Sequence, residues 1–93
     1  MRRRFVVRGD VQGVNFRTSA AESARHLGLT GRVWNRDDGA VECVAEGDPA
    51  AIERFRDWLG RGPRLARVER VEVADAPGEH RYREFGISRE PAD

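Results

Sequence analysis

The sequence has 93 residues, of which 39% are hydrophobic, and its 17 basic and 16 acidic side chains leave a net charge of +1. This length predicts a single domain, residues 1–93, with a core of modest thickness. The nearly balanced charge argues against a nucleic acid or a membrane surface as partner.

Cysteine and histidine are too few for most metal and redox sites. Cys43 is the only cysteine, which excludes an intramolecular disulfide and a cysteine-rich zinc site. His26 and His80 have no metal-ligand spacing, so no metal and no cofactor are expected. The start MRRRFVVRGD lacks the apolar segment of a signal peptide or membrane span, and a cytoplasmic location is expected. Its arginines, Arg2–Arg4, are expected to be solvated.

The first quarter of the chain predicts a strand followed by a helix. Residues 4–11 include adjacent valines after a phenylalanine, which indicates a strand. From Phe16 onward, apolar residues recur at helical intervals, with Asn15 in the N-cap position and Gly28 where a C-terminal cap belongs.

The middle of the chain predicts a hairpin and a second helix. Strands at 29–35 and 40–47 flank the turn sequence RDDG. Asp48 is a suitable N-cap for the helix that follows, and Pro49 suits its first position. The glycine-rich segment 60–64 ends this helix. Its buried stripe is expected to be Ile52, Phe55 and Leu59.

The last third predicts two more strands. Residues 66–73 indicate a fourth strand, although its valines do not keep to alternate positions and its buried face is therefore ambiguous. A loop at 74–80 leads to a short fifth strand within 81–89, and a disordered tail is expected only at the end, EPAD.

The order of elements is βαββαβ with a short additional C-terminal strand. This order is typical of the ferredoxin-like split β-α-β sandwich, an α+β fold. We expect an antiparallel sheet with both helices on one face.

The corner between the first strand and the first helix suits an anion. The loop from Gln12 to Arg17 contains no proline, so every residue can donate a backbone N–H, and it ends at a helix N-terminus, which favours negative charge. Gly13 permits unusual backbone angles, and Arg17 in the first helical turn offers a planar fork of donors to a phosphate. The predicted phosphate-binding set is Gln12, Gly13, Val14, Asn15, Phe16 and Arg17.

Asn35 is expected at the same edge of the sheet. In this fold the third strand lies between the first two, so the end of the second strand should lie about 10 Å from the corner, or two strand spacings. The Asn35 amide can donate and accept hydrogen bonds at once, which suits the orientation of a water beside a bound phosphate.

Other interpretations of these residues remain open. Gly13 could be an ordinary turn glycine, Arg17 a solvated residue at a helix start, and Asn35 a turn former. Asp37 and Asp38 are best explained by the turn. The whole chain could also be a non-enzymatic phosphate-binding or RNA-binding ferredoxin-like module, although the aromatic signature of RNA binding is missing.

The sequence resembles the acylphosphatases. The likeness rests on GDVQGVNFR (9–17) with GLTGRVWNRDDGAVECVAEGD (28–48), and it continues through 55–73 and the final FGI. The resemblance implies hydrolysis of acyl phosphates to a carboxylate and inorganic phosphate without metal. It assigns phosphate binding to Arg17 and water positioning to Asn35. The chain is separately expected to be a monomer.

Two departures from the family pattern are visible at the corner. Asp10 stands where such proteins usually have a basic or neutral residue, and it could repel phosphate or pair with Arg8 or Arg17. Asn15 stands where glycine or an aromatic residue is common. A related module forms the N-terminal part of larger hydrogenase-maturation proteins, but this chain lacks their zinc-finger-like cysteines.

Overall fold

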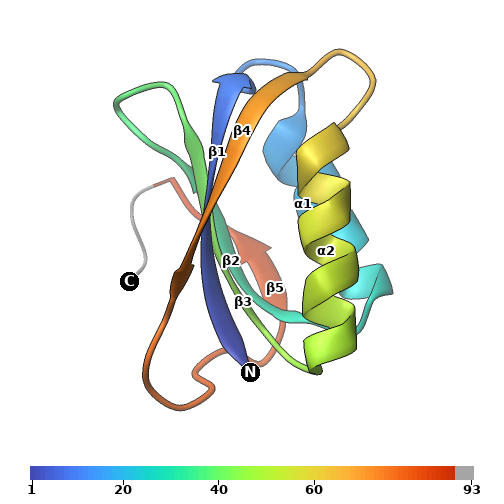
Figure 1. The fold of residues 1–93 in the computed structure, drawn as a ribbon, viewed down its shortest axis with the longest axis vertical. Coiled ribbons are helices and arrows are strands. Elements are labelled where there is room, and N and C mark those ends of the chain that lie inside the picture. Colours follow the sequence, from blue (N-terminus) through green and yellow to red (C-terminus); the bar gives the residue numbers. More distant parts are fainter. Residues whose placement is uncertain (90–93) are drawn as a thin grey trace.

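The computed structural model describes residues 1–89 as one α+β domain, and the predicted order of elements is confirmed (Figure 1). None of the helices in this range has the length and apolar character needed to cross a bilayer. The elements are β1 (Arg2–Asp10), α1 (Phe16–His26), β2 (Thr30–Asn35), β3 (Val41–Glu46), α2 (Pro49–Arg61), β4 (Arg67–Asp75) and β5 (Phe85–Ile87).

The five strands form one sheet in the order β4-β1-β3-β2-β5, and both helices cover the same face of it (Figure 1). The pairings of β1 with β3, β1 with β4 and β2 with β3 are antiparallel, as predicted. The short β5 adds to β2 in parallel, so the sheet is mixed at that edge. The third strand lies between the first two, which is the arrangement that brings the two predicted parts of the site to one edge.

The core fills the space between the helices and the sheet. The ring of Phe55 from α2 lies at its centre, 6.1 Å from the ring of Phe5 in β1 and 5.6 Å from that of Phe85 in β5. On α1 the buried side chains after Phe16 are all alanine, so this helix packs closely against the sheet. The predicted stripe of Ile52, Phe55 and Leu59 is buried.

The prediction for the first arginines is wrong, because β1 begins at Arg2 rather than at residue 4. Arg2 is only 8% exposed, and its Nε donates to a carboxylate oxygen of Glu46 at 2.9 Å. The alternation of a strand carries Arg2 and Arg4 onto the face away from the helices, where acidic residues of β3 pair with both.

The irregular facing of β4 has a structural cause. The register between β1 and β4 shifts between Arg8 and Gly9, as at a β-bulge. Val68 and Val71 are three positions apart, yet both pack against the core, because the extra residue resets the alternation. The predicted tail at 90–93 lies outside the described residues.

Candidate active site

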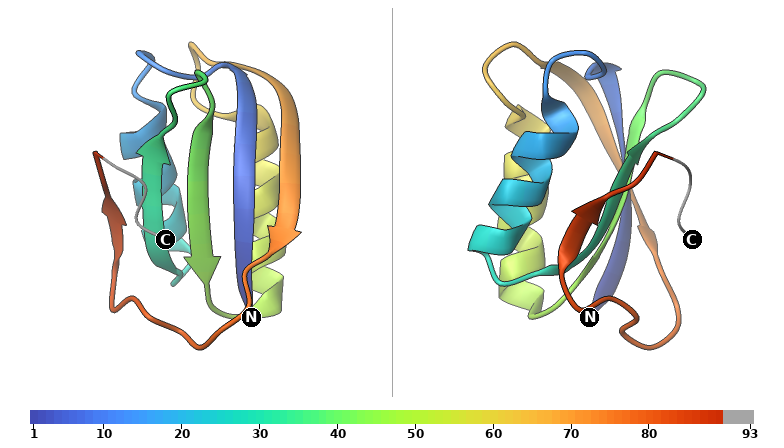
Figure 2. Two further views of the ribbon diagram at one scale, coloured as in Figure 1. Left: turned by 90° about the vertical axis from the view of Figure 1, so that its left-hand side faces the viewer. Right: turned by 180° about the vertical axis from the view of Figure 1, so that it is seen from behind.

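The corner after β1 and the end of β2 lie at the same end of the molecule (Figure 2). Between them is a pocket of about 220 Å³, to which both Arg17 and Asn35 contribute. These two residues are 18 positions apart in sequence. The sheet order brings them together, because β3 lies between β1 and β2. The complete lining is Val11, Gly13, Asn15, Phe16, Arg17, Thr18 and Asn35.

The backbone of the corner is curled by two residues in the left-handed region. Gly13 has a φ of 77° and Asn15 a φ of 63°. Asn15 occupies the N-cap position of α1, as predicted, and its carbonyl accepts a hydrogen bond from the Ser19 amide at 3.2 Å.

The side chain of Asn15, however, makes no capping hydrogen bond. An N-cap side chain reaches back to the helix amides from an extended backbone, and the left-handed conformation does not offer that geometry. The amides of Phe16, Arg17 and Thr18 therefore have no acceptor within α1 and no cap from Asn15. Phe16, Arg17 and Thr18 all line the pocket, which therefore lies at the positive end of the helix dipole.

Arg17 is the charged side chain of the pocket. Within residues 1–89, no carboxylate forms an ion pair with it. Arg8 of β1, by contrast, pairs with Glu72 at 2.9 Å and with Asp38 at 3.1 Å. Asp10 is exposed and, in the described part of the chain, forms an ion pair with neither Arg8 nor Arg17, the two partners considered for it. Among the residues that the structure describes, no acidic side chain neutralises the positive charge of Arg17.

Asn35 is the last residue of β2 and is opposite Val41 of β3 in the register. The tight hairpin after it is closed by the Arg36 amide, which donates to the Ala40 carbonyl at 2.8 Å. Asp38 binds the Ala40 amide at 3.1 Å, and this hydrogen bond, with those from Arg8 and Arg36, lowers the pKa of the Asp38 carboxyl to about 2. The prediction that Asp38 belongs to the turn is confirmed. Its hydrogen bonds to Arg8, Arg36 and Ala40 stabilise the hairpin that follows Asn35.

Three of the six loop residues predicted to hold phosphate have side chains directed elsewhere. Phe16 is 2% exposed, and its ring lies in the core, 5.6 Å from that of Trp58. Val14 packs against the hydrophobic core. Gln12 uses its side-chain NH2 group to donate to two carbonyls of the hairpin. Val11 and Thr18 line the pocket but were not predicted. Thr18 could have been found from the sequence, because it follows Arg17 in the first helical turn.

The family model for acylphosphatases matches residues 3–87, which is nearly the whole chain. The chain belongs to the acylphosphatase family. It is 46% identical over 87 residues to an acylphosphatase of Mannheimia succiniciproducens, covering 94% of this chain and 97% of that one. The protein is therefore a hydrolase of this family.

Solved structures agree in fold as well as in sequence. The crystal structure of an acylphosphatase from Bacillus subtilis superposes with a TM-score of 0.89 at 34% identity, over 94% of this chain and 97% of that one. Full-length HypF in its phosphate- and nucleotide-bound form contains a similar segment, with a TM-score of 0.85 at 27% identity. The match covers 94% of this chain but only 11% of HypF.

Among the described residues, no Cys, His, Asp or Glu lines the pocket that Arg17 and Asn35 share. Cys43 is fully buried in β3, and burial raises the pKa of its thiol. In the described range, residues 1–89, His, Cys, Asp and Glu side chains form no cluster of three or more suited to a metal ion.

Proposed function

We propose that the chain hydrolyses the carboxyl–phosphate bond of acyl phosphates, with phosphate held by the amides of the 12–17 loop and by Arg17, and with water oriented by Asn35. The observation that carries this proposal is the single pocket that Arg17 and Asn35 share. The products are a carboxylate and inorganic phosphate.

Arg17 and the helix amides act on the phosphoryl group. The guanidinium presents parallel N–H donors to two phosphate oxygens, and the uncapped amides of the first turn of α1 supply further donors from the other side. As water attacks, charge spreads over the equatorial oxygens, and donors already in position stabilise it without rearrangement.

Asn35 orients the nucleophile. Its carboxamide accepts a hydrogen bond from water through its oxygen and donates one to a phosphate oxygen through its nitrogen. From the end of β2, at the edge of the pocket, it holds the water in line with the scissile P–O bond. Phosphorus is attacked, the acyl oxygen departs, and no phosphoenzyme forms.

The leaving group needs no proton donor. A carboxylate is the base of an acid with a pKa of roughly 4, so it departs unaided at neutral pH. Asp38, the carboxyl of the hairpin beside Asn35, has a pKa of about 2 and carries no proton to donate at that pH. This arrangement suits an acyl phosphate and disfavours an ordinary phosphate ester, whose alkoxide must be protonated.

Hydrolysis of benzoyl phosphate in ¹⁸O-labelled water, with a metal chelator present, tests the proposal. We expect turnover with the label in phosphate, and little activity on p-nitrophenyl phosphate, the matched ester. Label in benzoate would show attack at the carbonyl carbon and overturn the role of Asn35. Loss of activity with chelator would overturn metal independence.

A further inference from the structure

The backbone ladder that joins β1 to β3 ends before it reaches the site. Its last pair is Val7 with Val41, whereas β1 continues to Asp10 in contact with β4 alone. The loop that carries Arg17 therefore leaves the sheet on one side of the gap, and the hairpin that follows Asn35 leaves it on the other.

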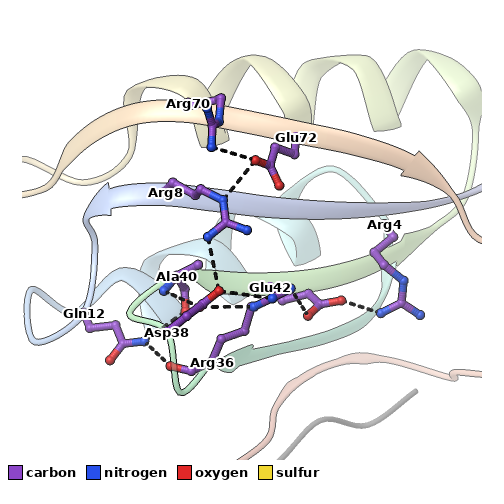
Figure 3. Close-up of polar contacts among 9 residues, drawn as sticks. All are labelled: Arg4, Arg8, Gln12, Arg36, Asp38, Ala40, Glu42, Arg70 and Glu72. Atoms are coloured by element: carbon purple, nitrogen blue, oxygen red, sulfur yellow. Dashed lines mark hydrogen bonds and ion pairs between the residues drawn. The ribbon is translucent and has the colours of Figure 1, made fainter.

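Gln12 spans this gap with its side chain (Figure 3). Its Nε2 donates to the carbonyl of Arg36 at 2.8 Å and to the carbonyl of Ala40 at 2.9 Å. Arg36 and Ala40 lie at the base of the hairpin and are joined to each other, since the Arg36 amide donates to the Ala40 carbonyl. One NH2 group thus ties the loop to both arms of the hairpin.

The hydrogen bonds of Gln12 join residues that lie close in sequence to both proposed catalytic residues. Gln12 precedes Gly13, the first curled residue of the corner, and Arg36 directly follows Asn35. The far side of the hairpin is also fixed, because Asp38 binds both Arg8 of β1 and Arg36 (Figure 3). Gln12 supplies the contact between the hairpin and the loop that leads into α1.

We propose that Gln12 is a positioning residue that sets the distance between the loop carrying Arg17 and the hairpin carrying Asn35. This inference rests on the proposed function, in which Arg17 holds phosphate and Asn35 orients water. Gln12 need not touch substrate with its side chain. It acts by keeping the oriented water in line with the phosphorus atom.

Glutamine is the side chain that this contact requires. Both partners are carbonyl oxygens, so the bridging group must offer two hydrogens, and a carboxamide nitrogen does so. Methionine has a similar length and shape but no donor, and asparagine keeps the donor but loses one methylene of reach. Gln12 is the only glutamine in the chain.

Steady-state kinetics of Gln12→Met on benzoyl phosphate test the proposal. We expect kcat to fall about 10- to 100-fold, the effect of a small misplacement at a reacting centre. The Ki for inorganic phosphate should stay within about twofold, because the amides and Arg17 belong to the loop itself. A general loosening of the pocket would raise Ki together with the loss of kcat.

A double-mutant cycle with Asn35→Ala separates positioning from simple destabilisation. If Gln12 acts through Asn35, adding Gln12→Met to the Asn35→Ala variant lowers kcat by less than about twofold further. Losses that multiply would overturn the proposal. Gln12→Asn is assayed in the same way and carries the test if Gln12→Met does not fold.

Thr30→Val is the matched control. It removes one partly buried side-chain hydrogen bond, from Thr30 Oγ1 to Glu46 at 3.1 Å, at the opposite end of β2. Its kcat should equal that of wild type, even if its melting temperature falls as far as that of Gln12→Met. Inactive wild type would refute the proposed function, whereas active wild type with fully active Gln12→Met would refute only this inference.

Discussion

At the residue scale, Arg17 has no acidic partner among residues 1–89, whereas Arg8 of β1 has two. We predict that Arg17→Ala lowers kcat/KM on benzoyl phosphate by at least about 100-fold, as for the loss of one preorganised donor. Arg17→Lys should recover little of it, because an ammonium is a point charge and cannot replace a planar fork.

Arg54→Ala is the control for this prediction, since Arg54 is an exposed residue of α2 and its removal changes the net charge by the same amount. It should hydrolyse benzoyl phosphate like wild type. Near-normal turnover by Arg17→Lys would show that charge alone suffices and would refute the bidentate role.

Asn35 should separate turnover from phosphate binding. We predict that Asn35→Ala lowers kcat about 100-fold while the Ki of inorganic phosphate changes little, because the water and not the phosphate loses its partner. Product-inhibition kinetics measure both quantities on one preparation. A Ki that rises in step with the loss of kcat would instead make Asn35 a phosphate ligand.

At the element scale, the start of α1 depends on Asn15 in a left-handed conformation with a φ of 63°. A β-carbon makes this conformation costly for most residues, and asparagine tolerates it better than alanine does. We predict that Asn15→Ala lowers the free energy of unfolding by about 1 kcal/mol. Asn15→Gly should be close to neutral, since glycine adopts positive φ freely.

Glu22 is the control for this prediction, because alanine and glycine should have the opposite order of stability there. Urea denaturation measures both pairs of variants. Glu22 is an exposed residue inside α1, where alanine is the better helix former, so Glu22→Gly should be less stable than Glu22→Ala by about 1 kcal/mol. The same order at position 15, with glycine below alanine, would show that the left-handed corner does not limit stability.

The elements and the proximity of Arg17 to Asn35 could be predicted because their signals are local or topological. Hydrophobic spacing identifies each strand and helix, and the order βαββαβ fixes which strand ends share an edge. The contact of Gln12 could not be predicted, because its partners are backbone carbonyls 24 and 28 residues away that leave no mark in the sequence.

The buried Arg2 escaped prediction for a related reason. A charged side chain in a strand usually faces solvent, and only the register of β1 with β3 shows that Arg2 is opposite Glu46. The left-handed Asn15 was also invisible, since its residue type fits an ordinary N-cap equally well.

At the scale of the whole molecule, the two faces of the sheet differ in their side chains. The helices cover the main hydrophobic core, and the other face carries a smaller apolar cluster, of Trp34, Val44 and Ala76, beside a continuous series of ion pairs (Figure 3). It crosses three strands and the hairpin in the order Arg70, Glu72, Arg8, Asp38, Arg36, Glu42 and Arg4. These ion pairs link β4, β1 and β3 to the hairpin that follows Asn35.

Glu46 anchors the opposite end of this polar face. It is 1% exposed, and its carboxylate accepts hydrogen bonds from the side chains of Arg2 and Thr30 and from the amides of Arg81 and Tyr82. Burial acts to raise the pKa of Glu46, but these donors outweigh it, and the pKa lies below its ordinary value of 4.5. One carboxylate thus fastens the segment before β5 to the end of β3.

The lowered pKa determines how stability depends on pH. The ionised Glu46 is favoured in the folded state, so its contribution is fully present above the ordinary value of 4.5 and is lost as the pH falls through the lower folded pKa. We predict that Glu46→Gln costs about 3–5 kcal/mol at pH 7, the range for breaking a buried ion pair. The deficit relative to wild type should shrink as the pH falls, because the wild-type carboxyl is then protonated as well.

Thermal unfolding of wild type and Glu46→Gln from pH 7 to pH 2 measures this difference, with Glu53→Gln as the control. Glu53 is an exposed residue of α2, 3.9 Å from Arg56, so its substitution should change the melting temperature little at any pH. Other carboxyls with lowered pKa values, such as Asp38 and Glu72, titrate in both proteins and cancel in the comparison. A deficit that stays constant with pH would mean that Glu46 stabilises the fold by shape alone and that its charge contributes nothing.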